Sequence, residues 1–377
     1  MPFAAALSEH PLTAYATGEV CGGVLEQLGP HPDLAIVFVT LAHAGALEDV
    51  VATVREILHP SVLFGAASDS IIGGEREVEG TAGISLWAGR FGPVVPVRIP
   101  DGVPAGLPFE PSALVLVGDP FSVAPDDLLS SLAASHPGLP VIGGMASGAR
   151  GPGGSRLALD DAVVTSGAVG ALIGPGVDAR AVVSQGCRPI GRPYVVTEGS
   201  GNIIRTLAGR PALSRLDEVA GDLTPEEIRA VNSGGLHLGR VVDEHKADFG
   251  PGDFLVRQVL GGDREAGAIA VNDEVTVGTT VQFHVRDAIA AHDDLDALLA
   301  EAIDATPPDA ALLFTCNGRG EHLFGVPDHD AGLVGDRLGP LPVTGFFAAG
   351  ELGPVAGHNH LHSYTASIVL LTERRGR

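Results

Sequence analysis

The sequence predicts a mixed α/β fold (α+β in character) in which a βαββ unit is repeated within two related domains. Three segments support this prediction. Each contains an apolar strand, a crossover, a second strand ending in Gly and small polar residues, a turn and a third strand. They begin at "DLAIVFVT" (33–40), "SALVLVGDP" (112–120) and "AALLFTCNGRG" (310–320). Continuously apolar strands are typical of sheets buried on both faces. We therefore expect largely buried sheets covered by helices.

The remaining strands of each unit follow in order. The second strands lie in "SVLFGAASDSIIGGE", "LPVIGGMASGARGPGG" and "LPVTGFFAAGELGPVAG". The third strands lie in "GTAGISLWAG", "SGAVGALIG" and "SYTASIVLL". The spacing between units varies too much for a solenoid, which favours duplicated units within domains.

Three helices are indicated by apolar periodicity and by end signals. Thr224, Pro225 and Glu227 predict a helix start with a capping box. The segment 292–303 predicts a helix with acidic residues in its first turn and with the apolar side chains Leu295, Leu298, Leu299 and Ile303 on one face. The segment 47–58 predicts a helix whose apolar face contains Leu47, Val50, Val51, Val54 and Leu58.

The repeat arrangement changes near residue 185. A long stretch then holds two helical segments and the strands "GDFLVRQVLGG" and "VTVGTTVQFHV", and the third repeat follows. We therefore predict two domains, 1–185 and 186–377. The chain has 377 residues, of which 45% are hydrophobic and 18% charged, so it is long and apolar enough for two domains with sizeable cores.

Composition excludes several classes of function. Acidic residues number 46 against 23 basic ones, a formal charge of −23, which disfavours binding to nucleic acid or to an anionic membrane. Three widely separated cysteines indicate neither a disulfide framework nor a zinc knuckle. No signal peptide and no apolar stretch of about 20 residues is present, so we expect a soluble, acidic, cytoplasmic protein.

An ordered set of motifs resembles the FIST family (F-box and intracellular signal transduction), with its N-terminal and C-terminal domains. The N-terminal likeness is carried by "VLFGAASDSIIGGE" and "GISLWAG". The C-terminal likeness is carried by "GCRPIGRPYVVTEGSGNIIRTLAGRPAL", "FLVRQVLGGD", "GAIAVNDEVTVGTTVQF", "FTCNGRG", "GFFAAGELGP" and "LHSYTASIVLL".

The resemblance implies a sensory, signal-transducing domain that binds a small ligand, an amino acid or a similar metabolite, without established catalysis. It also implies a signalling protein of unknown identity as partner. The sequence carries no F-box, kinase, methyl-accepting or cyclase segment, so we expect a stand-alone sensor, and a homo-oligomer is compatible with it. "GGDRE" (261–265) superficially resembles a cyclase signature, but Gly-Gly-Asp between two strands indicates ordinary turn chemistry.

Candidate ligand-binding residues follow the apolar strands, where glycines let backbone N–H groups approach a ligand. These residues are Ser68, Asp69, Cys316, Asn317, Arg319, Glu351, Asn359 and His362. Arg319 and Glu351 could receive the carboxylate and the ammonium of an amino acid. The alternative is that they pair with each other or stabilise turns.

Three histidines, His358, His360 and His362, stand at alternate positions near the C-terminus. In an extended chain they would share one face about 6.6–7 Å apart, and His358, His360 and Glu351 could then hold a metal ion. Gly357 and Asn359 instead favour a turn, so neither a metal nor any cofactor is our first expectation.

Three functional hypotheses remain. The first is a non-enzymatic sensor of a small ligand. The second, a haem-binding sensor of nitric oxide, comes from the resemblance and needs one axial histidine, from His358, His360, His362 or His284. The third is a metal-dependent or cysteine-dependent hydrolase, in which Glu351, Cys316 and the histidines would act.

Overall fold

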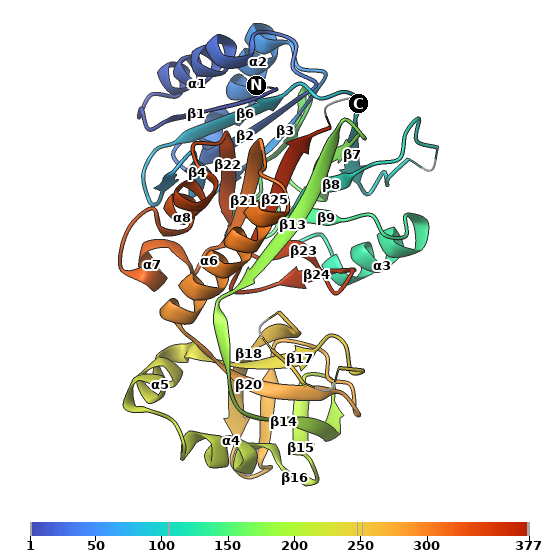
Figure 1. The fold of residues 1–377 in the computed structure, drawn as a ribbon, viewed down its shortest axis with the longest axis vertical. Helices are drawn as coiled ribbons and strands as arrows, with labels where there is room; N and C mark the ends of the chain where they lie inside the picture. Colours follow the sequence, from blue (N-terminus) through green and yellow to red (C-terminus); the bar gives the residue numbers. More distant parts are fainter. Residues whose placement is uncertain (1, 105, 247, 251, 375–377) are drawn as a thin grey trace. The chain divides into compact units, whose positions relative to one another are not determined.

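The computed structural model describes residues 2–104, 106–246, 248–250 and 252–374, which form two compact units (Figure 1). Unit 1 comprises Met1–Val183, Asp296–Leu361 and Thr365–Arg377, and unit 2 comprises Ser184–Leu295 and His362–Tyr364. The chain leaves unit 1 next to the predicted boundary at 185. The units nevertheless differ from the predicted consecutive halves, because the third repeat belongs to the same unit as the first two.

Within the described residues, unit 1 contains three six-stranded sheets with one common strand order. The first is β1 (Phe3–Ser8), β6 (Ile84–Gly89), β2 (Leu34–Thr40), β3 (Val62–Ser68), β10 (Leu157–Leu159) and β11 (Ala162–Val164). The second is β7 (Val94–Ile99), β12 (Ala168–Ile173), β8 (Ala113–Gly118), β9 (Val141–Met145), β23 (Glu351–Val355) and β24 (His358–His362). The third is β13 (Val177–Gln185), β25 (Thr365–Glu373), β21 (Ala310–Cys316), β22 (Val343–Ala348), β4 (Ile71–Gly73) and β5 (Arg76–Val78).

The predicted repeat is confirmed by strand direction. In every repeat the first and second strands are parallel, and the third strand is antiparallel to the first. A glycine of the second strand occupies the same register position in all three repeats, which pair Val37 with Gly65, Leu116 with Gly143, and Leu313 with Gly345.

A hairpin follows the second strand of each repeat, and it joins the sheet of a different repeat. The hairpin β4–β5 pairs with β22, β10–β11 with β3, and β23–β24 with β9. Each repeat thus gives one hairpin and receives one, an arrangement we call the hairpin exchange. At each exchanged hairpin, one backbone hydrogen bond of 2.8–3.0 Å joins the host repeat to the incoming chain. The three bonds run from Ala67 N to Arg156 O, from Met145 N to Gly350 O, and from Phe347 N to Ser70 O.

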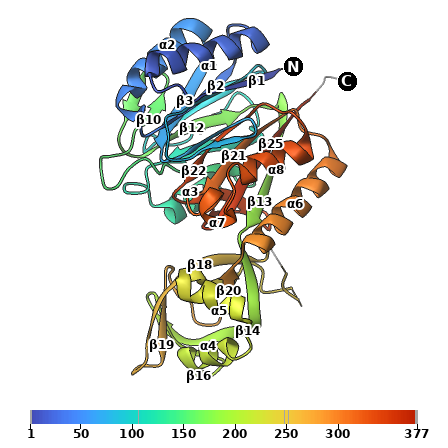
Figure 2. The same cartoon turned by 90° about the vertical axis from the view of Figure 1, so that its left-hand side faces the viewer.

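The three sheets share one apolar core, which includes Ile36, Val115 and Leu312 from their central strands. Helices α1 (Thr13–Leu28) and α2 (Leu47–Leu58), with the short η1 (Ala44–Ala46), cover the other face of the first sheet (Figure 2). All five predicted apolar residues of α2 are buried. The other crossovers contain α3 (Pro125–Ser135), α7 (Gly320–Phe324) and α8 (His329–Leu338).

Unit 2 is a β-barrel, because the strand order of its sheet is closed by pairing of β14 with β15. In order, the strands are β14 (Cys187–Ser200), β20 (Thr280–Arg286), β17 (Leu236–Val241), β18 (Phe254–Asp263), β19 (Ala268–Val271) and β15 (Ile203–Leu207), with β16 (Arg210–Pro211) beside β15. Helices α4 (Ala212–Ala220) and α5 (Pro225–Ala230) and the short η2 (Val231–Gly235) connect β16 to β17. The predicted capping box of Thr224 and Glu227 begins α5.

Helix α6 (Ala288–Ala305) begins four residues before the predicted start at His292. Asp287 explains the difference, because its Oδ1 accepts hydrogen bonds from the N–H groups of Ile289 and Ala290 and so begins the helix earlier. The predicted first-turn acid Asp294 therefore lies further along the helix, where it accepts hydrogen bonds from Ser184 Oγ and Gln185 N. No helix in the described ranges is both long and apolar enough to cross a membrane.

The shared glycine of the second strands gives a testable prediction. A Cβ atom on Gly345 would lie 1.7 Å from the carbonyl oxygen of Leu313, so Gly345→Ala should force the two central strands apart. We expect it to lower the free energy of unfolding by at least about 1–3 kcal/mol. The control is Gly332→Ala in α8, where nothing lies within 4 Å of an added Cβ. Urea unfolding should show the control unchanged or stabilised, and equal losses in both variants would contradict the argument.

Candidate functional site

Three predicted residues, Cys316, Arg319 and Glu351, lie where the third repeat's strands end. Cys316 is the last residue of β21, and Glu351 begins β23 soon after β22 ends. Arg319 and Glu351 are fully buried. Burial alone would lower the pKa of Arg319, but the nearby carboxylate of Asp330, with smaller effects of Cys316 and Glu351, raises it above its ordinary value.

The direct partner of Arg319 is Asp330 of α8, which the sequence analysis did not identify. Arg319 Nε and Nη2 donate to the two oxygens of Asp330 at 2.7 and 2.9 Å, and Thr315 Oγ1 donates to it at 2.6 Å. Burial opposes ionisation of Asp330, yet the Arg319 charge holds its pKa well below the usual range. Glu351 accepts hydrogen bonds from the N–H and Oγ1 of Thr365, at 3.2 and 2.8 Å.

Glu77 joins this group from the exchanged hairpin β4–β5. Its Oε1 accepts hydrogen bonds of 2.9 Å from the N–H groups of Asp330 and Ala331 in the first turn of α8. Asp328 in turn accepts from Glu77 N at 2.7 Å and from Arg76 Nη1 at 2.7 Å. Burial, followed by the charge of Asp330, raises the pKa of Glu77 to about 8. We call Glu77, Arg319, Asp330 and Glu351 the charged cluster.

In the charged cluster, the buried atoms Arg319 Nη1 and Glu77 Oε2 have no hydrogen-bond partner among the described residues. Arg319 is 0% exposed and Glu77 is 4% exposed, so bulk solvent does not reach these two atoms to replace a missing partner. An unsatisfied buried polar group costs about 1–3 kcal/mol. Such atoms commonly receive an ordered water molecule or a polar ligand group.

Ser68 and Asp69 lie at the hairpin exchange. Ser68 ends β3 and is fully buried, whereas Asp69 is exposed. Asp69 N donates to Ser147 Oγ at 3.0 Å, and Ser147 Oγ donates to Phe347 O at 2.5 Å, so one serine side chain connects all three repeats. Asn317 is exposed, and its N–H donates to Ala348 O at 2.9 Å.

Asn359 has a structural task in the hairpin β23–β24. Its Oδ1 accepts a hydrogen bond from Val141 N at 2.9 Å, and its Nδ2 donates to Leu139 O at 2.8 Å. In the equivalent hairpin, Asp160 Oδ1 accepts from Leu63 N at 3.1 Å. Both side chains therefore fasten an exchanged hairpin to its host strand, so the polar atoms of Asn359 are already engaged.

The predicted turn at the three histidines is wrong. Residues His358–His362 form β24, because the turn is completed at Ala356 and Gly357, both with positive φ. His358 is exposed, His360 half-buried and His362 buried. In the described part of the chain, no three His, Cys, Asp or Glu side chains are grouped so that they could hold a metal ion. The metal alternative at His358, His360 and Glu351 therefore has no structural support.

His284, the other candidate haem ligand, lies opposite His237 on neighbouring barrel strands. Both are buried, and their Nδ1 atoms lie 3.0 and 2.9 Å from the backbone oxygens of Gln282 and Gly235. Burial lowers the pKa of each imidazole to about 4. The ring of His284 packs 4.7 Å from that of Phe254. Both imidazoles are therefore neutral at pH 7.

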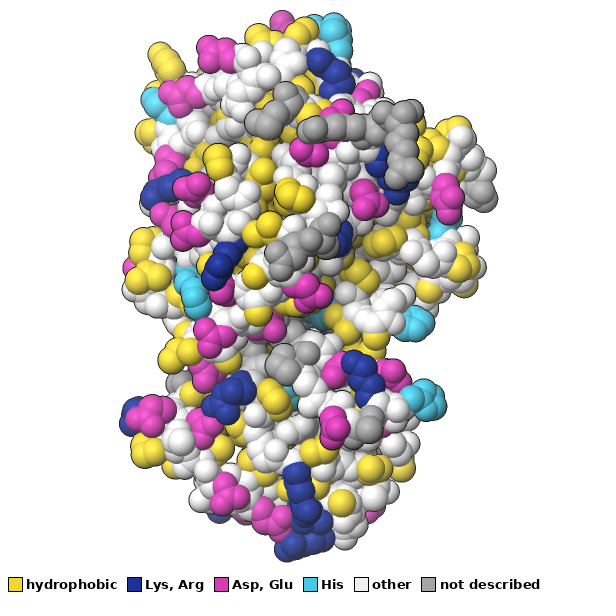
Figure 3. Space-filling model, in the orientation of Figure 1, with side chains coloured by type: hydrophobic (Ala, Val, Ile, Leu, Met, Phe, Trp, Pro, Cys, Tyr) yellow, Lys and Arg dark blue, Asp and Glu magenta, His cyan; other side chains and the backbone are white. Residues whose placement is uncertain are grey.

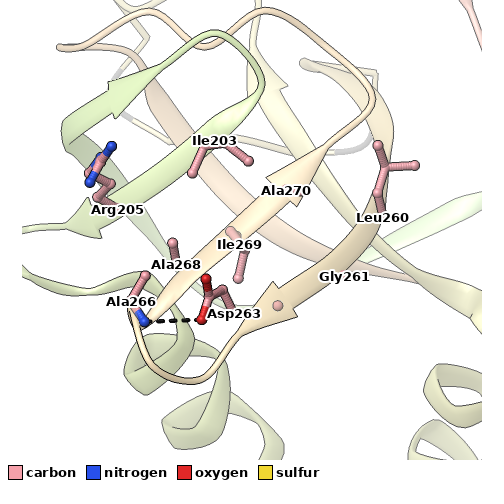
Figure 4. A pocket seen from close by; sticks show the side chains of 10 residues that line it. Ile203, Arg205, Leu260, Gly261, Asp263, Ala266, Ala268, Ile269 and Ala270 are labelled. Atoms are coloured by element: carbon pink, nitrogen blue, oxygen red, sulfur yellow. Dashed lines mark hydrogen bonds between the residues drawn. The ribbon is translucent and has the colours of Figure 1, made fainter.

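Two surface cavities involve regions singled out in the sequence. One, of about 450 Å³, is lined by α3 and by the start of β24, including His358, Asn359 and His360. Another, of about 440 Å³, lies on unit 2 over β15, β18 and β19 (Figure 4). There Asp263 Oδ1 accepts hydrogen bonds from the N–H groups of Glu265 and Ala266. The turn expected at Gly-Gly-Asp is therefore displaced along the chain, because Gly261, Gly262 and Asp263 are the last residues of β18 and the turn follows at 264–267.

The raised pKa of Glu77 predicts a pH-dependent stability. The folded protein holds this proton up to about pH 8, while the unfolded chain releases it near 4.5. Stability from this group is therefore complete below 4.5 and is lost as pH rises through 8. Glu77→Gln keeps the Oε1 acceptor but cannot ionise, so its stability advantage over wild type should grow between pH 5 and 9, as measured by urea unfolding. A constant difference across this range would refute the assignment, and Glu75→Gln is the control.

Substitution of Arg319 should harm the fold. Arg319→Met removes the guanidinium and leaves Asp330 buried without its countercharge, which typically costs about 3–5 kcal/mol. Exposed Arg229, paired with Glu226 at 2.8 Å, is the control, and Arg229→Met should cost at most about 1 kcal/mol. Thermal unfolding of both variants measures the contrast. Similar melting temperatures would mean that the Arg319–Asp330 pair contributes little to stability.

Comparison with known proteins shows two matching family domains, the FIST N domain over residues 33–210 and the FIST C domain over residues 212–354. An uncharacterized protein of Mycobacterium tuberculosis is 43% identical over 379 residues, covering 97% of this chain and 98% of the relative. An uncharacterized protein of Mycobacterium bovis is 42% identical over 375 residues, covering 96% and 97%. FIST domains are associated with signal transduction and sensing. The chain belongs to the FIST family.

Proposed function

We propose that this chain is a non-enzymatic sensory protein that binds a small ligand, an amino acid or a similar metabolite, and passes the signal to a partner protein in the cytoplasm. Membership of the FIST family supports the sensory role. On the face drawn in Figure 3, acidic side chains are scattered among basic ones. Together with the formal charge of −23, this favours a small ligand over nucleic acid.

The charged cluster is the ligand site of this proposal. The observation that carries it is the pair of buried atoms, Arg319 Nη1 and Glu77 Oε2, that have no hydrogen-bond partner in the described chain. A carboxylate oxygen suits the free N–H of Arg319, and an ammonium group suits the carboxyl side of the cluster, which includes Glu351. An amino acid carries both groups.

Burial of the cluster supplies a reason for signalling. Because Arg319 and Glu351 are fully buried, a ligand reaches them only when the surrounding elements separate. The exchanged hairpin β4–β5 and the first turn of α8 cover this region through the Glu77 and Asp328 hydrogen bonds. A ligand that binds the separated state better than the closed state shifts the population between them.

The proposal is tested by thermal shift with each amino acid on protein freed of bound ligand. At least one amino acid should raise the melting temperature. A free ligand concentration of about 100 times Kd adds roughly 2.7 kcal/mol to the free energy of unfolding. Glu351→Gln keeps an acceptor for Thr365 but removes the charge, so it should lose the shift. His358→Ala, in the separate cavity beside α3, should keep it.

Two outcomes would count against this proposal. If no metabolite pool shifts the melting temperature of folded, ligand-free protein, the sensory ligand is not of this class. If the purified protein shows a Soret band, the haem alternative takes its place.

A further inference from the structure

The interior of the unit 2 barrel ends in a narrow cavity of about 20 Å³, room for about one water molecule. Five barrel strands contribute apolar side chains to it, and the connection between β19 and β20 completes the lining. The apolar lining residues are Val196, Ile204, Leu238, Val271, Val275 and Val281. We call this cavity with its rim the barrel mouth.

Two arginines point into the barrel mouth, where apolar side chains would be expected. Leu238 of β17 belongs to the barrel core, and Arg257 of β18 is its cross-strand partner, so both lie on the inner face. Arg240 follows Leu238 by two residues and shares that face. The side chain of Arg257 is only 12% exposed and that of Arg240 is 38% exposed.

The carboxylate of Asp273 lies near both guanidinium groups. Asp273 Oδ2 lies 3.3 Å from Arg257 Nε and 3.6 Å from Arg240 Nε. These distances exceed the roughly 2.7–2.9 Å of a charge-assisted hydrogen bond, which Arg319 and Asp330 reach elsewhere in the chain at 2.7 Å. Neither Arg240 Nε nor Asp273 Oδ2, both buried atoms, has a hydrogen-bond partner within the described residues. Asp273 therefore fits the two arginines poorly.

We propose that the barrel mouth binds a small aliphatic carboxylate. Its carboxylate group takes the place of Asp273 between Arg240 and Arg257, with geometry that a free ligand can optimise and a tethered side chain does not. Its aliphatic part lies against Val196, Leu238 and the other apolar lining residues. Because the closed cavity holds about one water molecule, the connection 273–279 moves aside when the ligand enters.

The movable part is the short connection 273–279. Backbone hydrogen bonds from Val275 N to Gly201 O, at 2.7 Å, from Gly278 N to Val196 O, at 2.8 Å, and from Val196 N to Thr279 O, at 2.9 Å, hold it over the barrel end. Displacing Asp273 releases its contact with the arginines, so ligand binding changes the conformation of this segment. This inference concerns a second site, and its binding step does not depend on the charged cluster.

The first test compares isosteric probes on the intact protein. Isothermal titration calorimetry with 4-methylpentanoate and with its amide tests the need for the charge. We expect at least about tenfold tighter binding of the carboxylate, because the amide is uncharged and has only one oxygen that can accept from the two guanidinium groups. Leucine and 4-methyl-2-oxopentanoate share the carboxylate and the aliphatic body, so their relative affinities show whether an α-ammonium group, which exposed Glu274 could receive, is preferred.

Variants locate the site. Arg257→Leu should weaken binding of the preferred carboxylate at least about tenfold. Asp273→Asn should tighten it, because the competing charge is removed. Arg229→Leu, on exposed α5, is the control and should bind as wild type. Hydrogen exchange of residues 272–279 should increase when the ligand binds.

Equal affinity for the carboxylate and the amide, or no binding of either, would overturn the inference without any variant. So would unchanged affinity in Asp273→Asn. If amino acids raise the melting temperature of wild type and of Asp273→Asn equally, while Glu351→Gln loses the response, the proposed function stands and this site does not. If carboxylates bind the barrel mouth while Glu351→Gln responds as wild type, this site stands without the charged cluster.

Discussion

The hairpin exchange is the constraint on which the rest of unit 1 depends. A two-stranded hairpin is marginally stable alone, and each of the three hairpins gains its pairing from a strand of another repeat. No repeat can complete its six-stranded sheet with its own residues. The apolar core shared by the three sheets therefore requires all three repeats together.

The three hairpins use one backbone plan but different side chains, and this difference creates the charged cluster. Asp160 and Asn359 fasten their hairpins with one side-chain oxygen that accepts from a host-strand N–H group. The hairpin β4–β5 instead brings Glu77 to the first turn of α8, beside Asp330. A carboxyl in this place meets a buried carboxylate that Arg319 neutralises. Buried charge is thus concentrated at one of three otherwise similar junctions.

The repeats, the face of α2 and the capping box of α5 were predictable because their signals are local. Each depends on the spacing of apolar residues or on end residues within one element. The exchange was not predictable, since the same hairpins could have paired within their own repeats. The candidate site was also hard to predict, because it joins residues that are far apart in the sequence. Glu77 and Asp330 are 253 positions apart, and Asp330 follows no recognisable strand-end motif. At His358–His362, strand pairing outweighed the turn signal of Asn359, because the turn is already complete at Gly357.

The order of the chain gives the exchange a consequence for biosynthesis. Repeats one and two are completed before residue 184, yet the second sheet still lacks β23–β24, and the third sheet lacks β21, β22 and β25. As the polypeptide leaves the ribosome, most of the barrel of unit 2, Ser184–Leu295, emerges before these strands. Until then β9 presents an unpaired edge, and such edges attract other chains. The barrel can form from nearly contiguous residues. Unit 1 cannot complete its sheets until its final segment is synthesised. The contact order of unit 1 is therefore high, and we expect unit 1 to fold slowly.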